Sequence, residues 1–393
     1  ALQIMTATPN FNPGSWQQLS TLFYTILGAK RPKRTSSAGG TDATALKEIA
    51  LQHPLIARFV GEVVEYRKHA KAYSTYYCAD LLDDRVYYNL QADGTDTGRL
   101  ASNKSSLYSG TKSTAGKDRN YGLQIQNVPP YMRQALIADD GYLLGEVDKS
   151  QSEARCTAYL ANDLLLIEDL ETPGRDFYCY MAYRFFGIEI DKAHPLRHLV
   201  TKIVHGTTYI MQEATFIDLV GITEMQQYQL LLPQHKHLSL KAFAKYLLSL
   251  YTTTYSAVPA WWKQTAIFVG SQGIIVTPDG WTRRVFGNPR ETPKVQREIV
   301  AHQPQHLSVA VLNKTKVQAY YKLQVGSNKE FKLKAQIHDS ILFQAKEDRF
   351  QYYMTELINL LDVPLVMSNG STLRIPTDAK VGTNWKDMKK WIP

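Results

Sequence analysis

The stretch AQIHDSILF, from Ala335 to Phe343, decides the fold because it joins two apolar runs through a charged tip. The apolar runs predict two β-strands, and the triplet between them predicts a tight turn. His338 and Asp339 belong to this turn. A carboxylate without a partner is costly to remove from water. The tip is therefore either a solvated turn or a place at which a charged group meets Asp339.

A second aspartate follows an apolar strand earlier in the chain. In GEVDKSQSEAR, Asp148 comes after the predicted strand at residues 142–147 and before the predicted helix at residues 151–160. If the fold brings Asp148 and Asp339 together, their charges repel each other, and divalent cations such as Mg²⁺ relieve that repulsion. Two such ions stabilise the attacking and leaving oxygens of a phosphoryl transfer. Sequence spacing alone does not show whether the two aspartates meet.

The residues that follow Asp148 also fit a structural pattern. Ser150 and Glu153 form S-x-x-E, which predicts a capping box at the start of the helix. Helix capping accounts for Glu153 by itself, whereas Asp148 has no such structural role.

The composition is that of a globular protein with an excess of positive charge. The chain has 393 residues, 44% of them hydrophobic, which is enough for two or three domains. Its net charge of +9 makes a polyanion a candidate partner, although many basic proteins bind none. The three cysteines form no C-x-x-C pair, which argues against a zinc site and a disulfide scaffold. No apolar run reaches the roughly 18 residues of a membrane span.

The order of predicted elements indicates an α+β protein with a helical domain inserted into a sheet domain. Two helices separated at Pro54 come first, and a polar stretch at residues 91–122 predicts loops. After the strand and helix around Asp148, residues 163–290 are predicted to be mostly helical. The last section predicts a helix at about 294–323, the hairpin, a helix at about 347–361 and a final strand at about 371–376.

Four segments, in this order, resemble the polymerase region of family A DNA polymerases, the bacterial DNA polymerase I type. TGRLAS, QIHDS and two longer segments carry the resemblance, which covers nearly the whole chain. They are TGRLAS (Thr97–Ser102), LQIQNVPPYMRQALIADDGYLLGEVDKSQSEAR (Leu123–Arg155, similar to motif A), RHLVTKIVHGTTY (Arg197–Tyr209, motif B) and QIHDS (Gln336–Ser340, motif C).

The resemblance implies a right-hand polymerase fold with a thumb, a palm built on an antiparallel sheet, and mostly helical fingers. It implies a DNA-directed DNA polymerase that adds deoxynucleoside triphosphates to a primer 3′-hydroxyl and releases pyrophosphate. The expected domains are residues 1–95 as thumb and N-terminal segment, 96–162 as first part of the palm, 163–290 as fingers and 291–393 as second part of the palm.

The family assigns metal binding and catalysis to Asp148 and Asp339, with the backbone carbonyl of Lys149 as a further ligand. Two Mg²⁺ ions, with Mn²⁺ as a substitute, would activate the primer hydroxyl and hold the triphosphate. Glu153 would fill the space of a ribose 2′-hydroxyl, which is compatible with capping. By resemblance, the primer–template contacts are Arg99, Arg133 and His338, with Gln303 and Gln305 as weaker minor-groove candidates.

Motif B would bind the incoming nucleotide. Positions 197, 201, 205 and 209 share one broad helix face because they step by four residues. The resemblance implies that Arg197 holds the γ-phosphate, that Tyr209 stacks near the templating base, and that Tyr178 touches a phosphate. Thr201 stands where the family has a lysine, so we predict that Lys202, one residue later, takes over that contact.

Several further positions depart from the family pattern. His205 replaces an aromatic residue on the nucleotide sugar, Ile210 a glycine, Lys149 an aromatic residue of motif A, and Ser340 the glutamate of motif C. These departures leave Asp148, Asp339, Arg197 and Tyr209 in place. They point to a divergent, phage-like polymerase rather than to an inactive one.

The expected partners are primer–template DNA and dNTPs, with a separate exonuclease, a helicase–primase or a processivity factor as further candidates and no membrane. The chain begins near the thumb, so we expect no proofreading exonuclease in it. The expected location is the cytoplasm of a bacterial or phage-infected cell, with an organelle matrix as the alternative. The alternative function is a catalytically inactive primer–template or single-strand DNA-binding factor. An RNA polymerase or reverse transcriptase is a weaker candidate because Glu153 suits a deoxynucleotide site.

Overall fold

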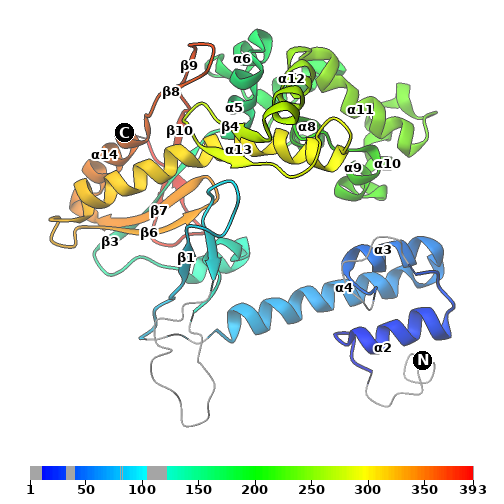
Figure 1. Ribbon diagram of the computed structural model, residues 1–393. Helices are drawn as coiled ribbons and strands as arrows, with labels where there is room; N and C mark the ends of the chain where they lie inside the picture. The colour runs from blue at the N-terminus through cyan, green and yellow to red at the C-terminus, as the bar shows by residue number, and fades with distance from the viewer. Residues whose placement is uncertain (1–10, 32–39, 80, 82, 104–121, 393) are drawn as a thin grey trace. The chain divides into compact units, whose positions relative to one another are not determined.

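The computed structural model describes residues 11–31, 40–79, 81, 83–103 and 122–392, and the chain divides into two compact units (Figure 1). The first unit contains residues 1–89 and 103–124, and the second contains residues 90–102 and 125–393. None of the helices within the described ranges is long and apolar enough to cross a membrane.

The first unit is helical. Asp42 begins its second helix by accepting a hydrogen bond from the Ala45 N–H at 2.9 Å. Pro54 has no N–H to donate, and the chain makes a short 3₁₀ turn there before the next helix, so the predicted break at Pro54 is confirmed. The elements are α2 (Trp16–Ser20) with a π-helical turn (Thr21–Ile26), α3 (Ala43–Gln52), the 3₁₀ turn (Pro54–Ile56), and α4 (Ala57–Ala72) with a π-helical turn (Tyr73–Tyr77).

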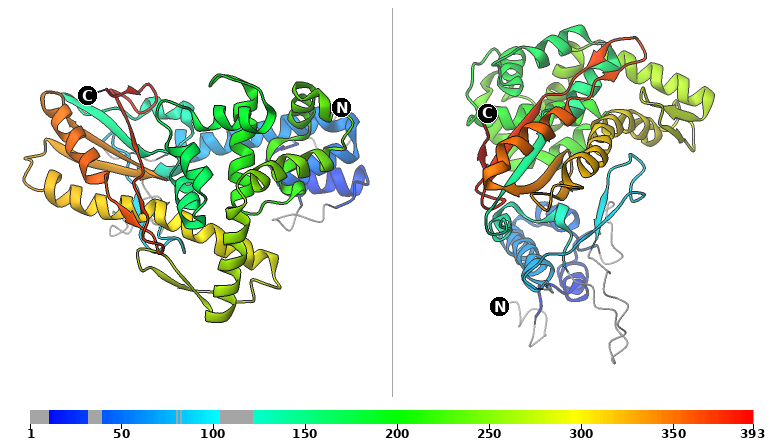
Figure 2. Two further views of the ribbon diagram at one scale, coloured as in Figure 1. Left: turned by 90° about the horizontal axis from the view of Figure 1, so that it is seen from above. Right: turned by 90° about the vertical axis from the view of Figure 1, so that its left-hand side faces the viewer.

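A five-stranded antiparallel sheet forms the base of the second unit. Its strand order is β11-β10-β3-β7-β6, so β3 lies at the centre between two strands from the C-terminal part of the chain. Figure 2 shows this in the teal β3 strand, which has the red β10 strand beside it. The strands are β3 (Tyr142–Lys149), β6 (Phe331–Ile337), β7 (Ser340–Lys346), β10 (Thr377–Gly382) and β11 (Lys389–Lys390).

The two faces of the sheet differ because side chains alternate along each strand. Val147 and Phe343 point to the face that packs against α13 (Pro293–Ala319) and α14 (Phe350–Leu361). Gly145 is required on this face, since a Cβ there would lie 2.3 Å from the Phe343 ring. The opposite face of β3 carries two half-buried acidic residues, Glu146 and Asp148, near the end of the strand.

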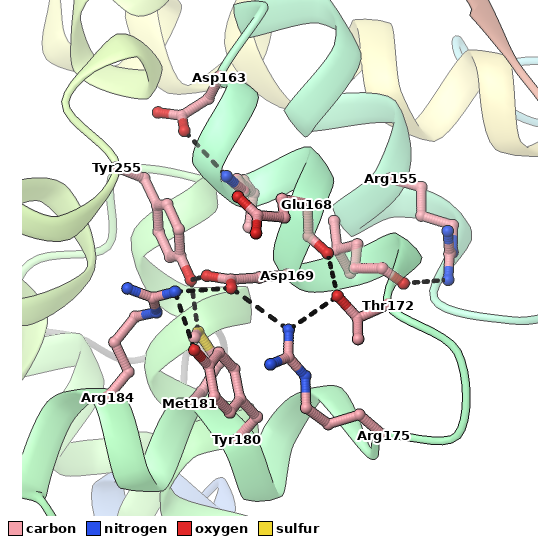
Figure 3. Close-up of polar contacts among 12 residues, drawn as sticks. Arg155, Asp163, Glu168, Asp169, Thr172, Arg175, Tyr180, Met181, Arg184 and Tyr255 are labelled. Carbon is pink, nitrogen blue, oxygen red and sulfur yellow. Dashed lines mark hydrogen bonds and ion pairs between the residues drawn. The ribbon is translucent and has the colours of Figure 1, made fainter.

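Helices of residues 152–272 form a separate apolar core around α8. A buried carboxylate, Asp169, which is 2% exposed, joins three parts of this region (Figure 3). It accepts hydrogen bonds from Arg184 and the Tyr255 hydroxyl, both at 2.7 Å. The helices are α5 (Ser152–Ala161), α6 (Leu164–Glu171), α7 (Phe177–Phe186), α8 (Pro195–Thr208), α9 (Glu213–Val220), α10 (Ile222–Leu231), α11 (Leu240–Thr254) and α12 (Ala257–Gln272). The predicted α+β class is confirmed.

Three two-stranded sheets and one shifted strand complete the described fold. The strand expected at 371–376 is wrong in position, because only Thr372–Leu373 is a strand there (β9), paired with β8 (Leu365–Val366). The strand that joins the sheet is β10, whose sequence TDAKVG has too little apolar alternation to predict it. Within the predicted loop at 91–122, β1 (Asn89–Gln91) pairs with β2 (Ala101–Asn103), and residues 104–121 lie outside the described residues. The third small sheet pairs β4 (Ile274–Val276) with β5 (Thr282–Arg284).

Candidate functional site

The hairpin tip and the end of β3 bring the two aspartates beside each other. Ile337 pairs with Ser340 across the tip, which leaves His338 and Asp339 as the two turn residues. Asp148 lies opposite Ser340 on the neighbouring strand, and the next N–H, of residue 149, donates to the Asp339 carbonyl at 3.2 Å. His338 is exposed and has a φ of 51°, the left-handed conformation that a turn of this kind imposes.

The electrostatics of this pair suit a cation. Burial, and after it the negative charges of Asp339 and Glu146, raise the pKa of Asp148 to about 7, against an opposing effect of Lys380. Nowhere in the described part of the chain do three or more His, Cys, Asp or Glu side chains form a ready metal cage. Two adjacent carboxylates suit Mg²⁺, because this ion prefers oxygen ligands and fills its other coordination positions with water or phosphate oxygens.

Glu153 lies in a network above the aspartates. Its carboxylate accepts hydrogen bonds from the Arg99 guanidinium and from the Tyr209 hydroxyl. Arg99 also lies 3.4 Å from an Asp339 oxygen, and the Ser152 hydroxyl donates to Asp339 at 2.8 Å. Burial, and then the Glu153 charge, raise the pKa of the Tyr209 hydroxyl. Motif A, motif B, motif C and the TGRLAS segment therefore meet at one point.

The predicted capping box is wrong. Helix α5 begins at Ser152, and its N-cap residue Gln151 has a φ of 53° and makes no side-chain capping bond. The Ser150 hydroxyl instead donates to the carboxylate of Asp378 on β10. Asp148 and its neighbours turn the chain sharply, so Ser150 lies one residue too early to cap, and Glu153 is left for the network with Arg99.

One face of α8 gathers three of the predicted nucleotide-binding residues. Arg197 forms a two-pronged ion pair with Asp176, with N–O distances of 3.0 and 2.9 Å. The Arg197 guanidinium lies 5.4 Å from the Tyr178 ring centroid. The Tyr178 hydroxyl is 3.3 Å from Nε2 of His205, which lies about two turns beyond Arg197 on α8. Asp176 also caps α7 by accepting a bond from the Cys179 N–H at 3.0 Å, so it holds Arg197 rigidly.

Lys202 points elsewhere on α8. Its ammonium lies 3.3 Å from a Glu224 oxygen on α10 and 3.5 Å from the Leu219 carbonyl. Among the described residues, no hydrogen bond or ion pair joins Lys202 to Arg197 or His205. The nucleotide role predicted for Lys202 stays a prediction, and it requires the lysine to leave Glu224.

The Lys149 side chain has a structural role. It is buried, and its ammonium donates to the carbonyls of Leu361 at 2.7 Å and Ile375 at 2.6 Å, and to the Thr377 hydroxyl at 3.2 Å. Burial lowers the pKa of Lys149 to about 8. This side chain ties β3 to the end of α14 on the core face, which explains how a lysine is accommodated in motif A. Only its backbone carbonyl remains a candidate ligand.

The remaining predicted DNA contacts lie apart from this network. Arg133 stacks 4.2 Å from the Trp385 ring centroid, and its Nε donates to the Val128 carbonyl at 3.5 Å. Gln303 and Gln305 are half-buried on α13. Among the described residues, no hydrogen bond or ion pair links Arg133, Gln303 or Gln305 to Asp148 or Asp339.

The structure adds a support for Arg99 that sequence reasoning missed. His306 on α13 contacts the Thr97 carbonyl through Nδ1 at 3.0 Å and the Asp279 carboxylate through Nε2 at 2.9 Å. Asn313, on the same helix, donates to the Gly98 carbonyl at 3.0 Å. These bonds fix the loop that carries Arg99. The signal was present in the seven-residue spacing of His306 and Asn313, which places both on one helix face.

Comparison with known proteins gives a consistent result. The model of DNA polymerase family A matches residues 2–387. DNA polymerase I of Caldicellulosiruptor bescii is 25% identical over 96% of this chain and 41% of its own length. Thermostable DNA polymerase I of Thermus aquaticus is 24% identical over 97% of this chain and 42% of its own length. The chain thus spans about two-fifths of these curated relatives.

The fold also matches a solved structure. The POL domain of Pol1 from M. smegmatis, in complex with DNA primer-template and dNTP, aligns with a TM-score of 0.73 at 20% identity. The alignment covers 98% of this chain and 63% of that one. At this identity the likeness shows a shared fold.

Proposed function

This chain belongs to DNA polymerase family A, and on that premise we propose that it is a DNA-directed DNA polymerase. It extends a primer 3′-hydroxyl with deoxynucleoside triphosphates in template order and releases pyrophosphate. The observation that carries this proposal is the adjacency of Asp148, near the end of β3, and Asp339, in the β6–β7 turn beside it. We assign the helices of residues 1–95 to the thumb, the sheet to the palm and residues 163–290 to the fingers.

The two aspartates would hold the metal ions, with the Lys149 carbonyl as a further ligand. Bound Mg²⁺, or Mn²⁺ in its place, lowers the pKa of the primer hydroxyl and stabilises the leaving pyrophosphate. Ser152 and Arg99 orient Asp339 through its two oxygens, which keeps this carboxylate directed at the reaction centre.

The face of α8 would bind the triphosphate. Three groups there can donate hydrogen bonds to phosphate oxygens: the Arg197 guanidinium, the Tyr178 hydroxyl and the His205 imidazole. Asp176 holds Arg197 in the absence of nucleotide, and a phosphate would share or replace that partner. Glu153, fixed by Tyr209 and Arg99, would occupy the space of a ribose 2′-hydroxyl and so select deoxynucleotides.

Primer–template DNA would contact Arg99, Arg133 and His338, with Gln303 and Gln305 as minor-groove candidates. A positive net charge of +9 supports a polyanionic partner. The bacterial origin of the relatives supports a cytoplasmic location for the activity.

A primer-extension assay tests the proposal. Wild type is expected to extend a primed template with Mg²⁺, and Asp148→Ala and Asp339→Ala to lose at least about 10³-fold in rate. Asp348→Ala, which removes an exposed carboxylate far along the chain, is the control and keeps its rate. Extension by both aspartate variants at the wild-type rate would refute the metal assignment. Wild type that binds primer–template without extending it would favour the inactive DNA-binding factor.

A further inference from the structure

We propose that Glu146 on β3 supplies the third carboxylate of the metal site, in place of the motif C glutamate that Ser340 replaces. This inference rests on the proposed function, because it concerns the metal ions of that reaction. The observation behind it is a direct contact: the Ser340 hydroxyl donates a hydrogen bond to Oε1 of Glu146 at 2.9 Å.

The strand register directs Glu146 toward the site. Side chains two residues apart on a strand point to the same face, so Glu146 and Asp148 share a face of β3. Residues directly opposite in an antiparallel pair also share a face, which adds Ser340 opposite Asp148. Glu146 is half-buried on this face, next to the strand that carries Asp339 at its tip.

Ser340 leaves the space that Glu146 fills. Its side chain is small and 4% exposed, and its hydroxyl is held between the Ile337 carbonyl, at 3.0 Å, and the Glu146 carboxylate. A glutamate at position 340 would reach into the volume now taken by the Glu146 carboxylate. Compared with the family pattern, the acid is therefore on β3 instead of β7, on the face that also carries Asp148.

Within the described ranges, Glu146 forms no ion pair with a side chain of the protein. Lys380 lies opposite Glu146 in the β10 register, yet no lysine, arginine or histidine among the described residues comes within ion-pair distance of Glu146. A half-buried carboxylate near two others of the same sign disfavours folding unless a cation meets it. A divalent ion held by Asp148 and Asp339 is a group of the required charge. The three carboxylates do not form a cage as they stand, so Glu146 would turn its carboxylate from the Ser340 hydroxyl toward that ion.

Asp378 provides an internal comparison. It lies opposite Asp148 on the same face, but on β10, the side of β3 away from Asp339. Its side chain is exposed and accepts a hydrogen bond from the Ser150 hydroxyl. It matches Glu146 in charge and shares this face of the sheet with Asp148, and no hydrogen bond joins it to Ser340.

The test is a titration of the full chain with Mn²⁺, followed by electron paramagnetic resonance. Glu146→Gln is expected to weaken Mn²⁺ binding by about tenfold, the effect typical of residues that support metal ligands. Asp378→Asn keeps the wild-type affinity. Ser340→Glu in a Glu146→Ala background restores much of the affinity lost in Glu146→Ala, because alanine vacates the volume that Glu146 fills and an acid returns to the family position. Thermal melts of each variant without metal verify that it is folded.

Equal Mn²⁺ affinity in wild type and Glu146→Gln would overturn the inference. An equal loss in Asp378→Asn would also overturn it, because the effect would then follow net charge. If the double variant does not fold, the comparison of Glu146→Gln with Asp378→Asn decides alone. Failure of the inference differs from failure of the proposed function: in the first case wild type still extends primers and Asp148→Ala still loses Mn²⁺, and in the second wild type extends none.

Discussion

Asp148 disfavours folding when no metal is present. Burial and neighbouring acids raise its pKa to about 7 from 3.8, so the folded state holds a proton that the unfolded state releases. Stability therefore falls as pH rises from about 4 to 7, and the full effect is present above pH 7. We expect Asp148→Asn to be more stable than wild type at pH 8 in EDTA, by on the order of 2 kcal/mol after solvent screening. Urea unfolding at pH 4 and pH 8 measures the difference.

The same variant should lose its advantage when metal is added. Mg²⁺ stabilises wild type in proportion to how much more tightly it binds the folded state. Mg²⁺ should stabilise Asp148→Asn much less, because the variant has lost one of the two carboxylates proposed to bind the metal. Asp348→Asn, at an exposed site, is the control for a simple change of charge. A difference in stability between wild type and Asp148→Asn that is the same at pH 4 and at pH 8 would contradict the effect assigned to Asp148.

Lys202 distinguishes two uses of one side chain. If it contacts the triphosphate, as its position after Thr201 predicts, Lys202→Ala raises the KM for dNTP by about tenfold or more, while Glu224→Gln frees the lysine and leaves the KM unchanged or lowers it. If Lys202 only ties α8 to α10, both variants lose the same ion pair and have the same small effect. Steady-state KM values for the two variants, with melting temperatures, separate these outcomes. A matched small effect would reject the nucleotide role.

Helix α13 carries a buried histidine that stacks on the His306 ring. His302 is 1% exposed, and neither of its ring nitrogens has a hydrogen-bond partner within the described structure. Burial, with the charges of Arg283 and His306, lowers the pKa of His302 to about 4. Between pH 6.5 and 4, His302 is therefore protonated in the unfolded chain and neutral in the folded chain. The contribution of His302 to the free energy of unfolding is expected to fall by roughly 3 kcal/mol as the pH drops from 6.5 to 4.

His302→Leu tests this at the level of the helix. Leucine fills a similar volume without polar atoms, so the variant should be at least as stable as wild type at pH 7 and should lose much of the decline at low pH. His198→Leu, which replaces an exposed histidine on α8, is the control. Denaturant unfolding across pH 4 to 7 gives both slopes. An unchanged slope in His302→Leu would place the acid sensitivity elsewhere.

Elements with a strong apolar period could be predicted, and those defined by partners could not. Apolar patterns predicted the β6–β7 hairpin, β3 and the long helices. The order of the motifs identified Asp148 and Asp339 as a pair. Strand β10 escaped prediction because Asp378 and Lys380 face the site side, which leaves too short a pattern. The role of Glu146 also escaped, since only the register across β3 and β7 brings it to Ser340.

The whole molecule separates charge of opposite sign. Its net charge is +9, yet Asp148, Asp339, Glu146 and Glu153 gather acids at one end of the sheet. The positive excess therefore lies outside this cluster of acids, and under the proposed function it is the part of the protein that would meet the phosphates of DNA. Affinity for DNA should come from those cations by release of counterions, and the acids of the centre should oppose it.

Salt dependence measures this division. We expect binding of the full chain to primed DNA, without metal, to weaken by about 10³-fold or more between 50 and 200 mM salt, which corresponds to at least six phosphate contacts. Arg133→Gln should reduce the slope of log K against log salt by about 1, because it removes one phosphate contact. Asp339→Asn should bind at least as tightly as wild type with an unchanged slope, since its charge repels phosphate without exchanging a counterion. Fluorescence anisotropy at four salt concentrations gives the three slopes. A shallow wild-type slope would mean that stacking, for which the chain's 24 tyrosines offer many surfaces, carries the affinity instead.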